Sequence, residues 1–254
     1  MRRFEATRSS TARKPSRREL LRIEGKPVPV TIKLNPRARR LIVKVHPSTG
    51  EVTVVAPSQR ALDRAMDFAR SESSWIARRL ARVPQPAAFG LGAKIPFRGK
   101  DHLVMPGETG PAPVWVEGQS GASVIRISGR AEHAARRLLD FLKREARRRL
   151  SEHAHEMSRR IELTPARITV RDTASRWGSC STARTLSFSW RLILAPDFVL
   201  DYVVAHEVAH MRHMNHGPRF WKLVQELAGD IETPQKWLAT NGPVLHRYAA
   251  RSRN

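Results

Sequence analysis

The sequence predicts an α+β fold in which a β-rich N-terminal region precedes a helical core with a small antiparallel sheet. Two patterns carry this prediction. Residues 27–128 consist of short segments in which apolar and polar residues alternate, separated by turns with Pro and Gly, and they include one predicted helix. In residues 129–246, apolar residues recur mainly at the spacing of a helix. A chain of 254 residues can bury a core for one large or two small domains, so a metal site would serve function rather than folding.

Both ends of the chain are basic. Residues 1–26 hold nine basic and three acidic residues with little apolar periodicity, so we expect a disordered arm, and residues 247–254 form a basic tail. The formal net charge of +23 can attract polyanions, which makes nonspecific nucleic acid a candidate partner. The alternative is a solvated surface without such a partner, because 2 Tyr and 8 Phe are few for a surface that stacks bases.

The composition indicates a cytoplasmic protein. The single cysteine, Cys180, excludes an internal disulfide. No apolar run approaches the roughly 18 residues of a membrane span, and no apolar segment of a secretion signal follows the charged N-terminus. We therefore expect neither export nor membrane insertion.

The N-terminal region is expected to build two groups of strands around one helix. Three segments that alternate apolar and polar side chains predict a small antiparallel sheet: residues 28–34, 40–45 and 51–56. Ser58 is a suitable N-cap for a helix that runs to about residue 83, with Trp75 in its buried face. Further short strands, punctuated by Gly and Pro, are predicted between residues 94 and 128.

The core region begins with a long helix. Apolar residues at helical spacing form one stripe along residues 131–163, and the remaining faces are strongly basic. Two strand-like segments, 167–172 and 186–195, bracket the glycine-containing turn SRWGSCS, and the second strand is a candidate edge for an extended peptide. A helix capped by Asp197 is then predicted to run to about residue 213.

The segment HEVAH lies within this last predicted helix. His206 and His210 are four residues apart, so both imidazoles can face a single ion while Glu207 projects beside it. Zinc binds neutral imidazole nitrogen well, and a catalytic zinc site keeps three protein ligands and one open position. A carboxylate beside such an ion can act as a general base on water, so this pattern predicts a zinc-dependent hydrolase with Glu207 as the base.

A third ligand must come from the residues after His210. His213 would stay on the same helix, where three ligands in one row cannot easily surround an ion tetrahedrally. His216 requires the chain to turn back, and Asn215 with Gly217 supplies residues that tolerate such a turn. We therefore favour His216 over His213.

The motifs around this site resemble a known family. The runs RWGSCS, WRLILAP and DYVVAHEVAHMRHMNHGPRFW are similar to those of the YgjP-like family of metal-dependent hydrolases, which is related to the SprT-like and WLM metallopeptidases. The resemblance is strong over residues 165–240 and looser but collinear from about residue 28. It implies a zincin-like α+β catalytic core, Zn²⁺ as the ion, Glu207 as catalytic base and His216 as the third ligand.

Peptide-bond hydrolysis is the predicted activity, with a peptide or an unfolded protein as substrate. Arg176, just before the glycine of the turn, either holds that turn or polarises a substrate oxygen. Two alternatives remain open: a metal-dependent nucleotide phosphoanhydride hydrolase that uses the abundant arginines, and a nucleic-acid-associated protein with a structural zinc. The first lacks a phosphate-binding glycine loop, and the second leaves Glu207 without a purpose.

Overall fold

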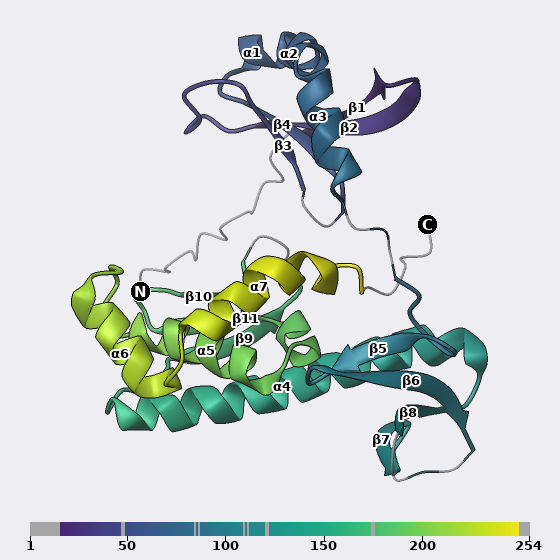
Figure 1. Ribbon diagram of the computed structural model, residues 1–254. Helices are drawn as coiled ribbons and strands as arrows, with labels where there is room; N and C mark the ends of the chain where they lie inside the picture. Colours follow the sequence, from purple (N-terminus) through teal and green to yellow (C-terminus); the bar gives the residue numbers. More distant parts are fainter. Residues whose placement is uncertain are drawn as a thin grey trace, which may run out of the picture. The chain divides into compact units, whose positions relative to one another are not determined.

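The computed structural model divides into two compact units, Met1–Val83 and Pro84–Asn254, which are described separately (Figure 1). It describes the following residues: 16–46, 49–83, 85, 87–108, 110, 112–119, 122–173 and 176–248. The predicted α+β class is consistent with the observed mixture of sheets and helices. The predicted domain boundary near residue 128 differs from the observed division after Val83.

The first unit is a four-stranded sheet with three short helices. Its strands have the order β1-β2-β4-β3 and are β1 (Ser16–Ile23), β2 (Lys26–Leu34), β3 (Ile42–Val45) and β4 (Val52–Ala56). The sheet is mixed, because β2 and β4 run parallel, and this corrects the predicted antiparallel sheet. Val30, Val52 and Val54 are fully buried in the core of this unit.

Part of the predicted disordered arm is ordered. Residues 1–15 lie outside the described residues, but β1 pairs with β2 as an antiparallel hairpin. Leu21 and Ile23 are buried, and the turn uses Glu24 and Gly25 with φ of 48° and 78°. This backbone matches a tight hairpin turn. The basic composition of residues 1–26 masked the two-residue alternation of this strand, so the prediction of disorder was wrong for residues 16–26.

The helix predicted to follow Ser58 is interrupted. It consists of α1 (Gln59–Asp63), α2 (Ala65–Ser71) and α3 (Ser73–Ala81). Ser58 acts as the predicted N-cap, since its hydroxyl accepts a hydrogen bond from the backbone N–H of Ala61 at 3.4 Å. Trp75 packs against the core of the first unit, and the guanidinium of Arg79 lies 5.2 Å from the centre of its ring.

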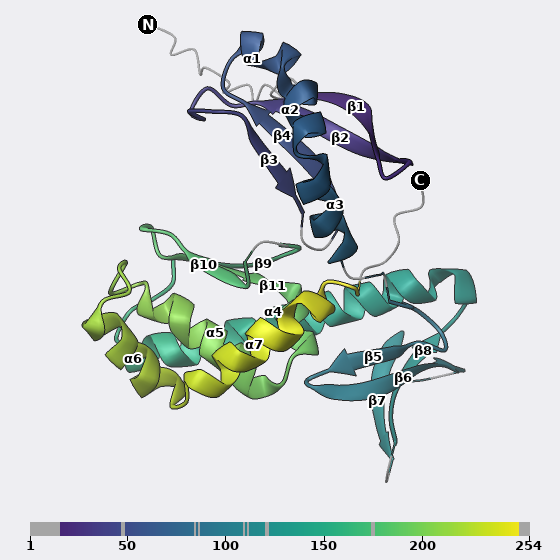
Figure 2. The same cartoon turned by 45° about the horizontal axis from the view of Figure 1, so that its top comes forward.

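A 27-residue helix, α4 (Ala134–Arg160), is the longest element of the second unit and follows a short 3₁₀ helix, η1 (Ala131–His133). It runs beside α5 (Asp197–Ala209) along the unit (Figure 1 and Figure 2). The predicted apolar stripe is its buried face: Leu138, Leu142, Ala146, Leu150, Ala154 and Met157. These residues reach the core that also holds the apolar residues of α5.

The second sheet belongs to this unit and not to the N-terminal one. Its order is β5-β6-β8-β7, with β5 (Lys94–Phe97), β6 (Lys100–Gly107), β7 (Val114–Gln119) and β8 (Ala122–Ser128). Ile95, Val104 and Ile125 are fully buried in the same core as the stripe of α4. This shared core explains why the domain boundary predicted near residue 128 was wrong, since the sheet cannot bury its apolar face without α4.

A three-stranded sheet lies next to α5 and has the order β10-β11-β9. Its strands are β9 (Arg167–Arg171), β10 (Gly178–Cys180) and β11 (Thr185–Ser189). The sheet is mixed, since β11 pairs antiparallel with β10 and parallel with β9. Two predictions are corrected here: β10 forms within the segment read as a turn, and the strand expected over residues 186–195 ends at Ser189, where η2 (Trp190–Leu194) begins.

Three helices complete the second unit: α5, α6 (Pro218–Ala228) and α7 (Glu232–Leu245). The predicted capping role of Asp197 is wrong, because its carboxylate bonds the guanidinium of Arg98 at 2.6 Å and α5 has no side-chain cap. The helix also ends at Ala209, not near residue 213, which leaves His210 as its C-cap. No helix among the described residues is long and apolar enough to span a membrane.

An ion pair between α4 and α5 predicts pH-dependent stability. His153 Nδ1 lies 2.5 Å from Asp201 Oδ1, and this hydrogen bond raises the pKa of His153 above its ordinary value. A raised folded-state pKa stabilises the fold below the unfolded pKa, and the contribution disappears as pH rises through the folded value. We expect His153→Ala to lower the free energy of unfolding by up to about 1 kcal/mol more at about pH 5.5 than at about pH 9. Urea unfolding at both pH values measures this; an equal loss at both would contradict it.

Candidate metal centre

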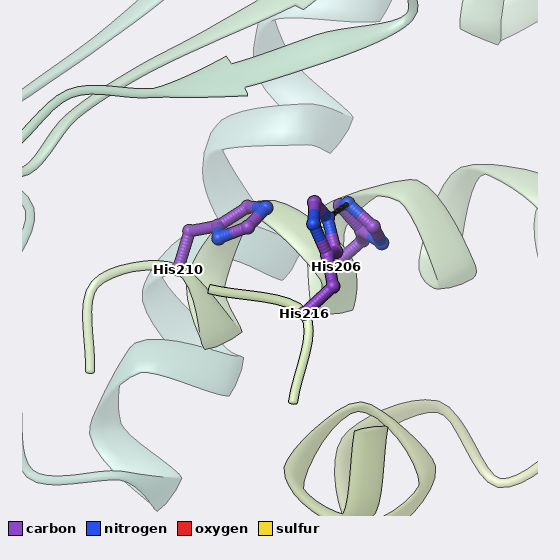
Figure 3. A group of neighbouring side chains, drawn as sticks. All are labelled: His206, His210 and His216. Carbon is purple, nitrogen blue, oxygen red and sulfur yellow. Dashed lines mark hydrogen bonds between the residues drawn. The ribbon is translucent and has the colours of Figure 1, made fainter. Parts of the chain in front are cut away.

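Three histidine side chains converge beside the C-terminal end of α5. His206 lies in its last turn, His210 caps it, and His216 returns from the loop that precedes α6 (Figure 3). The ligand atoms that they offer all lie within 4.8 Å of one another. The helix brings the first two together over one turn, and the loop brings the third, as the sequence predicted for His216.

The distance between the Nε2 atoms of His206 and His216 fits two ligands of a tetrahedral zinc ion. His206 Nε2 and His216 Nε2 are 3.2 Å apart. With zinc–nitrogen bonds of about 2.05 Å, two ligands of a tetrahedral ion lie about 3.3 Å apart. Burial and the neighbouring histidines lower the pKa of His206 to about 4, so its imidazole is neutral and can offer a lone pair. The three imidazoles therefore suit zinc, with no acidic ligand required.

Backbone contacts orient one of these rings. His210 Nδ1 lies 3.0 Å from the carbonyl oxygen of His213. A neutral imidazole that donates from Nδ1 carries its lone pair on Nε2, and such hydrogen bonds fix the ring orientation of metal ligands. His213 thus contributes its backbone rather than its side chain, which lies outside the group of three. No sequence pattern indicated a role for this carbonyl.

Aromatic side chains of α6 form one wall of the site. The ring of the fully buried Phe220 lies 4.5 Å from that of His210, 4.7 Å from that of His216 and 5.0 Å from that of His206, measured between ring centroids. Trp221 lies 5.8 Å from His206 and from His216. No pattern in the sequence indicated that Phe220 and Trp221 contact the histidines. Their rings also restrict the rotation of all three imidazoles.

Glu207 is buried next to the histidines. Glu207 is only 6% exposed, and burial raises the pKa of its carboxyl group to about 7. The positive charge of Arg176 partly offsets this rise. Its carboxylate packs against the backbone of β10: a Cβ atom placed on Gly178 would lie 2.5 Å from Glu207 Cγ and 2.6 Å from Oε1. Gly178 is therefore needed at this position to leave space for the carboxylate.

Adding one methyl group to Gly178 should disturb this arrangement. We expect Gly178→Ala to displace the Glu207 carboxylate and to lower hydrolytic activity by about 10-fold or more, because small misplacements of catalytic groups are costly. The matched control is Gly118→Ala on β7, where an added Cβ meets nothing within 4 Å. Turnover and zinc content measured on both variants test this, and a Gly178→Ala variant as active as the control would contradict it.

Three other polar residues lie near Glu207. Arg176 is exposed immediately before β10 and is close enough for its charge to lower the pKa of Glu207. Cys180 is half-buried, and burial with the nearby Glu207 charge raises its pKa to about 11, which keeps the thiol protonated. The hydroxyl of Tyr202 accepts a hydrogen bond of 2.8 Å from the amide of Gln235 on α7. Tyr202 lies one helical turn before His206, and no sequence pattern indicated that it lies near the site.

In the described ranges no strand pairs with the outer edge of β10, the strand beside Glu207, and this side is called its free edge. The N–H of Ser189 donates to the carbonyl of Trp177, and the N–H of Ser181 donates to the carbonyl of Thr185. In an antiparallel pair such bonded residues alternate with residues whose peptide groups point away. Gly178 and Cys180 lie at the alternate positions, so their N–H and C=O groups face away from β11.

This free edge corrects the predicted position of a peptide-binding strand. That role was assigned to the strand before α5, but β11 is the central strand and pairs on both sides. The edge next to the histidines is β10, within the segment that the sequence presented as a turn. A strand of three residues is hard to recognise from sequence because it is too short to show an alternation of apolar and polar side chains.

A family model described as YgjP-like, metallopeptidase domain, matches residues 39–241 of the chain. The match agrees with the resemblance of the motifs and covers the histidines, Glu207 and Arg176. No curated protein and no solved structure matches the chain significantly.

Proposed function

Because the chain belongs to the YgjP-like, metallopeptidase domain family, we propose that it is a zinc-dependent peptidase that cleaves extended segments of peptides or unfolded proteins. The observation that carries this proposal is the convergence of three imidazoles beside a buried carboxylate and a free strand edge. The family supplies the metallopeptidase class, whereas zinc, the roles of the residues and the substrate are our inferences.

His206, His210 and His216 would hold the ion. A bound zinc ion would supply Lewis acidity, which polarises a substrate carbonyl and makes water more acidic. Three imidazole nitrogens are one of the donor sets of catalytic zinc sites and leave one coordination position for substrate or water. Phe220 and the carbonyl of His213 keep the imidazoles oriented, so little reorganisation is needed on metal binding.

Glu207 would act as the general base and then as the acid. Its carboxylate takes a proton from the attacking water and passes it to the amine that leaves when the peptide bond breaks. Burial against β10 restricts this carboxylate to one position. Since both proton transfers involve the same group, its placement matters more than its exposure to solvent.

The substrate would bind as an added strand along β10. Gly178 and Cys180 direct their N–H and C=O groups outward, where an antiparallel peptide can form backbone hydrogen bonds with them. Such binding depends on the main chain of the substrate and accepts many side-chain sequences. Arg176 lies two residues before β10 in the chain. Its guanidinium group would stabilise the negative charge that develops on the substrate oxygen.

Product analysis tests this proposal. Zinc-loaded protein is incubated in parallel with an unfolded protein and with nucleoside triphosphates, and products are identified by mass spectrometry. We expect peptide fragments with new amino termini and unchanged nucleotides, since no phosphate-cradling loop is present in the sequence. Nucleotide cleavage without peptide cleavage would refute the peptidase assignment and favour the phosphoanhydride alternative.

A further inference from the structure

The second free edge of the three-stranded sheet is β9, on the opposite side from β10. The odd-numbered residues of β11 direct their peptide groups toward β10, so Leu186 and Phe188 must direct theirs toward β9. The parallel register places Thr169 between these two residues, which makes it a bonded position of β9. Ile168 and Val170 therefore direct their N–H and C=O groups away from the sheet, where no strand pairs with them among the described residues.

A groove runs along this edge. It has a volume of about 360 Å³ and is lined by every residue of β9 together with Arg147 of α4. Arg147, Arg167 and Arg171 are exposed, and in the described part of the chain none of their guanidinium groups forms an ion pair or hydrogen bond. Their neighbour Arg148, in contrast, is paired with Glu145 and Glu152. The groove therefore carries three arginines without compensating charge.

The arginines lie on both sides of the free edge. Side chains alternate along a strand, so Arg167 and Arg171 project from one face of the sheet and Ile168 and Val170 from the other. Ile168 and Val170 pack against the core that α4 helps to form. Arg147 of α4 reaches the groove from this same side of the sheet. A strand added to this edge would have guanidinium groups beside both of its faces.

We propose that the groove along β9 is a docking site for an extended, acidic segment of a partner protein. The segment pairs through its main chain with Ile168 and Val170 and places carboxylates beside Arg147, Arg167 and Arg171. Arg167 and Arg171 are four residues apart, or about 13 Å along a strand, which matches every fourth side chain of an extended partner. The site is separate from the metal centre and does not depend on the proposed activity.

The free peptide groups favour a polypeptide over a nucleic acid. Outward N–H and C=O groups at alternate residues offer both donors and acceptors at the spacing of another strand. Phosphates could pair with the arginines, but they would leave the carbonyl acceptors of Ile168 and Val170 without donors. Charge complementarity and main-chain pairing together therefore specify an acidic strand.

The test uses the full-length chain and a labelled peptide of about ten residues in which acidic residues stand at both odd and even positions among β-branched residues, so that carboxylates face both sides of the added strand. We expect binding at low salt that weakens on the order of 30-fold when Arg147, Arg167 and Arg171 are all changed to Gln. The matched control changes three other exposed arginines of α4 to Gln, namely Arg136, Arg144 and Arg159. It removes the same charge and should retain most of the affinity.

Two further measurements separate strand pairing from charge alone. The same peptide with its central nitrogens methylated keeps its charge but loses the donors of both edges, so we expect it to bind at least about tenfold more weakly. Amide hydrogen exchange of Ile168 and Val170 should slow when the unmodified peptide binds, whether or not exchange at Gly178 and Cys180 of β10 slows as well. Equal binding of both peptides, protection at β10 only, or a single-stranded oligonucleotide that binds while the peptide does not, would each overturn the proposal.

Discussion

Glu207→Gln is expected to abolish hydrolysis while leaving zinc bound. The amide has nearly the shape of the carboxylate and fits the same buried position beside Gly178, but it cannot accept the proton of the attacking water. General-base contributions are typically about 10²- to 10⁴-fold, so turnover should fall within or beyond this range. Zinc content, thermal stability and rate are measured on one preparation.

These three readouts distinguish the possible roles of Glu207. Normal zinc content with collapsed turnover supports a base that does not bind the metal. Loss of zinc together with activity would instead make the carboxylate a ligand or a support for one. A residual rate within about tenfold of the unmodified protein would not fit a general base. Substitution of a buried carboxylate by an amide should not lower thermal stability greatly, because no apolar contact is lost.

His216→Ala is expected to cause the largest loss of zinc affinity among residues after His210. It removes the nitrogen that lies 3.2 Å from His206 Nε2 and leaves only two imidazoles at the site. Loss of a residue that merely supports a ligand typically costs about 10- to 100-fold in metal affinity, and loss of a ligand itself should exceed that. Competition with a chromophoric chelator measures the affinity.

The matched control for His216 is His213→Ala. The structure uses the backbone carbonyl of His213, which binds His210 Nδ1, and alanine keeps that carbonyl. We therefore expect a change in zinc affinity of less than about tenfold in this variant. A greater loss for His213→Ala than for His216→Ala would reverse the assignment of the third ligand.

Features that depend on residues close together in the sequence could be predicted, whereas those that depend on distant residues could not. The stripe of α4 and the cap Ser58 depend on residues within a few turns, and both appear as expected. The strand β1 shows the opposite case, since its basic composition hid an alternation that matters only when β2 is beside it. The second sheet was likewise predicted to belong to the N-terminal region. Its apolar face is in fact buried by α4, a helix later in the sequence.

The local arrangement of the candidate site residues could be predicted from the sequence alone. His206, Glu207 and His210 are fixed relative to one another by a single helical turn, so their spacing was enough to expect two imidazoles beside a carboxylate. It also offered His216 because Asn215 and Gly217 permit a return of the chain. These inferences require only backbone geometry over about ten residues.

The surroundings of those residues could not be predicted from the sequence, because they depend on tertiary contacts. The approach of β10 to Glu207, the wall formed by Phe220 and the two free edges of the sheet arise from contacts between segments distant along the chain. A strand of three residues such as Gly178–Cys180 has no periodicity of its own to detect. Its position is set by pairing with β11 and by the missing side chain of Gly178, because the buried carboxylate fills that space.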